Sequence, residues 1–255
     1  FTSVSGDFSF YTWPSLEAIE RLKSQTAPHF KFSLKCTDII TLFKFPNIDR
    51  WENVAGQLNP NFLNPDLFVD LFLQPLEPLL SAKKLGPINL EFTSFHKGVF
   101  EDWQAFAGKL GPFMERVRKR TQSLDFDLSI EMRNRQFACP EFYQALLDLG
   151  ANPILSSWTR MPDLGDQWEN AKALQLNYAH ARAILRPGVI RENAVERFAP
   201  YGKIKETVPT ARIAALDIVQ WAKNRGKPAY LLFNNHLEGC AHQTIAEIAQ
   251  MLLHL

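Results

Sequence analysis

Strand-like and helix-like segments alternate along the chain, and this alternation constrains the fold more than any single motif. Alternating apolar and polar residues predict a strand at 30–35, and short apolar runs predict strands at 88–92 and 229–233. Amphipathic segments predict helices such as 66–80 and 99–119. The remaining strands are predicted at 1–4, 126–132, 152–155 and 173–184, and the remaining helices at 14–25, 140–150, 192–198, 209–224 and 244–253. This order is typical of a parallel sheet flanked by helices.

The strand count and the length of 255 residues favour one α/β domain over residues 1–255, a TIM (β/α)8-like barrel. Seven strands are predicted, which is one fewer than such a barrel has. Because the sequence opens with Phe1 and not with Met, we expect a first strand and helix to precede it in the natural gene. An open doubly wound sheet is the rival architecture, but no Gly-x-Gly-x-x-Gly follows any predicted strand.

Composition argues against several classes of protein. The net charge is +1, so no strong overall field draws the chain to nucleic acid or anionic lipid. The three cysteines form no Cys-x-x-Cys pair, which argues against a disulfide framework and favours a reducing compartment. No apolar run reaches the roughly 18 residues that a bilayer span requires. We therefore expect a cytoplasmic protein without a membrane span. The histidine spacing predicts no metal site, and no cofactor is identified.

Candidate catalytic residues lie where predicted strands end, because functional groups of parallel barrels follow the C-terminal ends of strands. Lys35 could supply a cation to an anionic group or an amine to a carbonyl. Glu91 and Glu131, on two later strands, could work together as acid and base. We predict these three residues as catalytic; a purely structural role for each polar side chain is the alternative.

Candidate substrate-binding residues follow the same strands. Arg133 lies two residues after Glu131, so both side chains can point the same way and anchor an anionic or polyhydroxylated ligand. A structural ion pair is the alternative. Asn234, Asn235 and Glu238 follow the most apolar strand and could bind a ligand or form a turn that caps the last helix. The remaining predicted binding residues are Asp7, Tyr11 and Trp158.

Several short motifs occur in an order that points to a known family. They are Val4–Tyr11 followed by Pro14, Phe30-Lys31-Phe32-Ser33-Leu34-Lys35, Leu85-Gly86-Pro87-Ile88, Ile130-Glu131-Met132-Arg133-Asn134, Ser157–Pro162, Arg186-Pro187-Gly188 and Phe233–Gly239. Together they resemble the YecE-like family, or DUF72, a group of TIM-barrel-like proteins of unknown function. The resemblance implies an eight-stranded barrel, closed or nearly closed, and no established activity. The chain departs from the family where Ser5 and Asp7 replace Glu and Asn, and where Leu42 replaces a His after a threonine.

Three classes of function remain open from the sequence. One is an enzyme that acts on a small anionic or polyhydroxylated substrate at the C-terminal face of the barrel. The second is a non-catalytic ligand-binding or scaffold protein, which the residues Ser5, Asp7 and Leu42 favour. The third, a nucleic-acid-binding or phosphodiesterase barrel, rests on fold analogy alone and is disfavoured by the near-neutral charge. A small-molecule ligand is therefore the expected partner.

Overall fold

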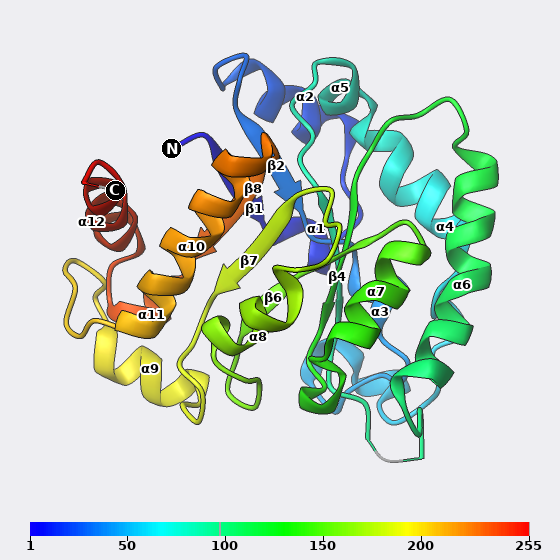
Figure 1. The fold of residues 1–255 in the computed structure, drawn as a ribbon. Coiled ribbons are helices and arrows are strands. Elements are labelled where there is room, and N and C mark those ends of the chain that lie inside the picture. The colour runs from blue at the N-terminus through cyan, green and yellow to red at the C-terminus, as the bar shows by residue number, and fades with distance from the viewer. Residues whose placement is uncertain (97, 255) are drawn as a thin grey trace. The chain divides into compact units, whose positions relative to one another are not determined.

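Helices and strands alternate through the chain in the computed structural model, which describes residues 1–96 and 98–254 (Figure 1). This confirms the predicted α/β class. The chain packs as two compact units. Unit 1 comprises Phe1–Ile130 with Leu149–Ala151, and unit 2 comprises Glu131–Asp148 with Asn152–Leu255.

Unit 1 is built on neighbouring strands. The strand β1 (Ser3–Gly6) pairs in parallel with β2 (Lys31–Leu34). Two parallel bridges join the β2 segment to the segment of β3 (Ile88–Phe92). On its other side β3 is next to β4 (Leu128–Met132), whose first three residues belong to this unit.

Side-chain caps mark the starts of the two longer helices of unit 1. Ser15 accepts a hydrogen bond from the Ala18 amide at the start of the second helix, and Asp102 does the same for the Ala105 amide at the start of the sixth. The described helices are α1 (Phe8–Tyr11), α2 (Leu16–Ser24), α3 (Asp38–Thr41), α4 (Pro65–Leu67), α5 (Glu77–Ser81) and α6 (Trp103–Arg120). Continuous π and 3₁₀ turns link α4 to α5, which confirms the predicted helix at 66–80.

Unit 2 holds a parallel sheet. The short strand β5 (Asn152–Pro153) is the neighbour of β4, and β6 (Leu155–Ser157) follows it closely in the sequence. The strand β7 (Ala179–Ala183) pairs in parallel with β6 on one side and with β8 (Ala229–Phe233) on the other. Residues that follow β6, β7 and β8 therefore lie at one edge of this sheet.

Helices of unit 2 flank the sheet, and the side chains of Trp168 and Trp221 are buried where two of these helices meet. The helices are α7 (Pro140–Asp148), α8 (Leu164–Ala171), α9 (Arg191–Phe198), α10 (Pro209–Arg225), α11 (Asn235–Glu238) and α12 (Ala241–Leu252). The ring of Trp168 on α8 meets that of Trp221 on α10 edge to face, with centroids 5.6 Å apart. Figure 1 shows α8 and α10 running beside β6 and β7.

Two strand predictions differ most from the structure. The strand predicted at 173–184 begins only at Ala179, and the helix α8 before it was not predicted. The buried apolar residues of α8 are only Leu164, Trp168 and Ala171, so the segment is too short for a helical period to be recognised in the sequence. The strand predicted at 152–155 is divided into β5 and β6. In the part of the chain that the structure describes, no helix has both the length and the apolar character needed to cross a membrane.

The turn that ends α11 gives a test of this packing. Gly239 has φ +108°, and a Cβ on it would lie 2.8 Å from the carbonyl oxygen of Lys203. Gly188 has φ +80°, yet a Cβ there would meet nothing within 4 Å. Because left-handed backbone alone costs an L-residue about 1–2 kcal/mol, we expect Gly188→Ala to lower the free energy of unfolding by that amount and Gly239→Ala by clearly more. Urea denaturation measures both, and equal losses would contradict the packing described.

Candidate functional site

A fully buried carboxylate, Glu131 of β4, organises the polar side chains of unit 2. It accepts hydrogen bonds from the guanidinium of Arg182 on β7 and from Ser156 Oγ on β6, the latter at 2.8 Å. The guanidinium of Arg133 lies 3.2 Å from the same carboxylate. A buried charge is tolerated when it is paired and hydrogen-bonded in this way. Glu131 therefore fixes the positions of side chains from three strand segments.

Arg133 directly follows β4 and is held on two sides. Its Nε and Nη2 atoms lie 3.3 and 3.2 Å from Glu131 Oε1, which confirms the expected contact between these residues. Its guanidinium carbon lies 4.1 Å from the ring centroid of Trp158, at a distance typical of cation–π stacking. The Arg133 side chain is 13% exposed, so this mostly buried side chain still contacts solvent. Among Glu131, Arg133 and Arg182, two guanidinium groups share one carboxylate.

The predicted residue Trp158 packs on an apolar cluster that lies at the same edge of the sheet. Trp158 directly follows β6 and packs, together with Val189 and Tyr201, on a small buried cluster. The cluster consists of Ile184, Leu185, Ala194 and Phe198. Trp158 thus links the guanidinium of Arg133 to the core of unit 2.

Unit 1 holds a second charged group at the ends of its strands. Lys35 Nζ lies 2.9 Å from Glu91 Oε2 and 3.4 Å from Asp7 Oδ1, with the ring centroid of Phe10 at 4.6 Å. The Lys35 and Glu91 side chains are buried, whereas Asp7 is 53% exposed. An ammonium donor beside carboxylate acceptors can bind ligand hydroxyl groups. The structure brings three predicted residues together here, a grouping that sequence spacing did not indicate.

Tyr11 lies at an exposed position in unit 1 beside a second ion pair. Its carbonyl oxygen accepts a hydrogen bond of 2.7 Å from Arg50, which also binds the buried Asp38 at 2.6 and 2.9 Å. Burial raises the pKa of Asp38, although the Arg50 guanidinium opposes this shift. Arg50 thereby ties the long irregular segment after β2 back to α1 and α3.

The asparagines after β8 act as helix caps. Asn234 Oδ1 accepts a hydrogen bond of 2.9 Å from the His236 amide, and Asn235 Oδ1 accepts one of 2.8 Å from the Ala241 amide at the start of α12. The predicted cap of the last helix is thus confirmed for Asn235, whereas Asn234 caps the short helix α11 instead.

Glu238 is a buried carboxylate that joins helices. It accepts hydrogen bonds from the Val208 amide at 2.5 Å, from Arg212 of α10 at 2.7 Å and from Thr244 of α12 at 2.7 Å. Burial alone would raise the pKa of Glu238, but these hydrogen bonds outweigh it and lower the pKa. Glu238 thus connects α10 and α12 with the segment that precedes α10.

Arg182 and His180 were not predicted from the sequence. They lie at alternate positions of the β7 segment Ala-His-Ala-Arg-Ala, which places both on one face of the strand. Polar residues that alternate with alanine within a strand were the available signal. Burial, with the nearby positive charge of Arg182, lowers the pKa of His180 to about 3.

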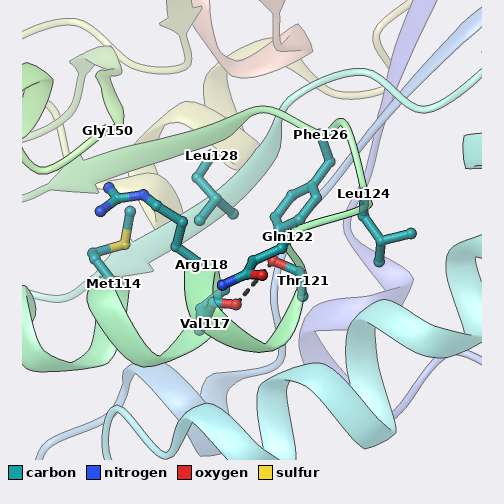
Figure 2. Close-up of a pocket in the computed structure, with 9 residues that line it drawn as sticks. All are labelled: Met114, Val117, Arg118, Thr121, Gln122, Leu124, Phe126, Leu128 and Gly150. Atoms are coloured by element: carbon teal, nitrogen blue, oxygen red, sulfur yellow. Dashed lines mark hydrogen bonds between the residues drawn. The ribbon is translucent and has the colours of Figure 1, made fainter.

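A small cavity of about 170 Å³ lies at the other end of β4 (Figure 2). Apolar and polar side chains both line it, and two of the polar ones already have partners within unit 1. Thr121 Oγ1 donates to the Val117 carbonyl at 2.8 Å, and Arg118 donates to the Leu149 carbonyl at 2.9 Å. The cavity therefore has the character of a packing gap. Across residues 1–96 and 98–254, no three His, Cys, Asp or Glu side chains are placed to hold a metal ion.

Comparisons with known proteins place the chain among barrel-like relatives. The family model described as "Protein of unknown function DUF72" matches residues 1–254. A DUF72 family protein from Enterococcus faecalis has a TM-score of 0.68 at 16% identity, covering 99% of this chain and 85% of its own. One from Thermotoga maritima has a TM-score of 0.61 at 20% identity, with the same coverages. A D-tagatose 3-epimerase-like protein has a TM-score of 0.55 at 11% identity, covering 99% and 89%. No curated protein matches significantly.

The two carboxylates that contact Lys35 allow a matched test. Removing one partner of a buried ion pair costs about 3–5 kcal/mol, whereas an exposed pair contributes about 0–1 kcal/mol. We therefore predict that Glu91→Gln lowers the free energy of unfolding by about 3 kcal/mol and that Asp7→Asn lowers it by less than about 1 kcal/mol. Urea denaturation of both variants checks this, and a similar loss from each would contradict the assignment.

His180 predicts a defined pH dependence of stability. Its pKa falls from 6.5 to about 3 on folding, so the unfolded chain binds the proton first. The contribution of His180 to the free energy of unfolding is therefore fully present above the pKa of the unfolded state. It decreases as the pH falls below that pKa. Between about pH 7.5 and about pH 5.5 this single group should remove about 1.4 kcal/mol of stability. Urea denaturation at both pH values should show that His180→Gln removes this part of the loss; an unchanged loss would refute the prediction.

Proposed function

The chain belongs to the DUF72 family, and from this premise we propose that it is an enzyme whose unit 2 binds a small organic anion at Arg133. The observation that carries the proposal is the placement of this guanidinium. Its edge contacts Glu131, its face contacts Trp158, and its side chain still reaches solvent. A preorganised guanidinium binds carboxylate or phosphate with little further loss of side-chain entropy.

The proposal gives Glu131 and Arg182 positioning roles. Glu131 already accepts hydrogen bonds from Arg182, Arg133 and Ser156, which suits a fixed anchor better than a group that exchanges protons. Arg182 supplies a second positive charge to the buried carboxylate, so that Glu131 does not by itself cancel the charge of Arg133. This combination favours an anionic ligand over a cationic one.

Acid–base chemistry is proposed for Lys35 and Glu91. Their contact of 2.9 Å in unit 1 joins a proton donor to an acceptor, as general acid–base catalysis requires. Lys35 directly follows β2, and Glu91 is the last residue but one of β3. In parallel α/β barrels, functional groups occupy the C-terminal strand ends. The likeness to a D-tagatose 3-epimerase-like protein supports the fold alone.

Anion binding is tested with two arginines that both stack on tryptophan. Arg133→Met should weaken the binding of inorganic phosphate or acetate at low ionic strength by about tenfold or more, because charge-assisted hydrogen bonds are lost. Arg225, whose guanidinium lies 5.1 Å from the ring centroid of Trp221, provides the control Arg225→Met. Isothermal titration calorimetry measures both. Equal affinities in the wild type and Arg133→Met would reject the proposed anion site.

Catalysis is tested by incubating the protein with phosphorylated sugars and hydroxy acids and following each by ¹H NMR. We expect wild-type protein to convert a member of this set, and Arg133→Met and Glu91→Gln to convert it much more slowly than Arg225→Met. Binding of these compounds without conversion would contradict the proposal of an enzyme and support a non-catalytic ligand-binding protein.

A further inference from the structure

A tyrosine and a histidine form a hydrogen-bonded pair at the sheet edge of unit 2. The hydroxyl oxygen of Tyr201 lies 3.0 Å from Nε2 of His236. Their rings meet nearly edge to face, with centroids 5.5 Å apart. Tyr201 comes from the segment between α9 and α10, and His236 from α11 immediately after β8. Both side chains are half-buried, so the pair is held in place yet reaches the surface.

The backbone of Tyr201 is held in an uncommon conformation. Its φ of +67° lies in the left-handed region that side-chain-bearing residues rarely adopt. The surrounding segment is fixed by Arg186, which contacts the Glu206 carboxylate at 2.6 Å and its carbonyl oxygen at 3.2 Å. Lys205 Nζ also donates to the Ala199 carbonyl at 2.8 Å. Strain of this kind persists where the surroundings enforce it, often at ligand sites.

Tyr201 of this pair and Trp158 of the proposed anion site contact the same buried cluster. Tyr201 and Trp158 pack on the same buried cluster, and Trp158 also stacks against Arg133. Trp158 follows β6 and His236 lies just after β8, and both strands are parallel neighbours of β7. The two groups therefore lie at one edge of one sheet in unit 2.

The chemistry of the pair suits neutral hydroxyl groups. A phenol and an imidazole each offer one donor and one acceptor. Burial lowers the pKa of His236, and the positive charge of Arg191 adds to this, so the ring is neutral near pH 7. A neutral imidazole can exchange its contact with Tyr201 for contacts with ligand hydroxyls without changing the net charge.

We infer that Tyr201 and His236 bind hydroxyl groups of the same ligand whose charged end contacts Arg133. The ligand is then a small polyhydroxylated anion, such as a sugar phosphate or a sugar acid. This inference rests on the proposed function, since it needs the anion at Arg133.

The test compares simple anions with their hydroxylated counterparts by calorimetry. Inorganic phosphate is compared with ribose 5-phosphate, and acetate with gluconate, so that the two pairs distinguish a phosphate from a carboxylate source. Wild-type protein should bind at least one hydroxylated anion about tenfold more tightly than its simple counterpart. Tyr201→Phe and His236→Phe should remove most of this excess and leave the affinity for the simple anion unchanged. The control variants are Tyr143→Phe, at a buried tyrosine of α7, and His242→Phe, at an exposed histidine of α12.

A second readout follows the His236 ring directly. Its ¹⁵N imidazole signals, assigned with His236→Phe, should shift on adding the hydroxylated anion that binds more tightly and remain unchanged with its simple counterpart. Simple anions that bind with no excess for either hydroxylated anion would overturn this inference alone, as would an excess that survives both variants. Failure of all four anions to bind would overturn the proposed anion site and this inference with it.

Discussion

The burial of Glu131 is the constraint on which the proposed site depends. A carboxylate removed from water requires compensating charge and hydrogen bonds, and here Arg182, Arg133 and Ser156 supply them from neighbouring strand segments. The same contacts hold Arg133 against Trp158. One buried charge thus converts a flexible arginine into a fixed group at the end of β4, before any ligand arrives.

Unit 2 uses a second buried carboxylate for a different purpose. Glu238 also binds an arginine, but its partners Arg212 and Thr244 belong to helices whose packing it secures. Glu131 instead holds Arg133, which lies at a strand end and reaches solvent. Glu131 was predicted as catalytic and Glu238 as substrate-binding, and the two buried carboxylates differ in what their partners do.

The sequence predicted the α/β class and most strands because the spacing of apolar residues follows from which side chains are buried in a helix or a strand. It placed Glu131 next to Arg133 because a two-residue spacing on a strand fixes which way side chains point. It did not predict Arg182, Tyr201 or the contact between Lys35 and Glu91. These depend on which strands become neighbours and on a left-handed backbone at a non-glycine residue, and no local pattern encodes either.

The most direct measurement of the central claim is a crystal structure of the protein with bound tungstate, a heavy tetrahedral analogue of phosphate. The account predicts the anion within hydrogen-bond distance of the Arg133 guanidinium, with Glu131 and Trp158 still in contact with that side chain. Tungstate bound only elsewhere on the molecule, with Arg133 untouched, would contradict it.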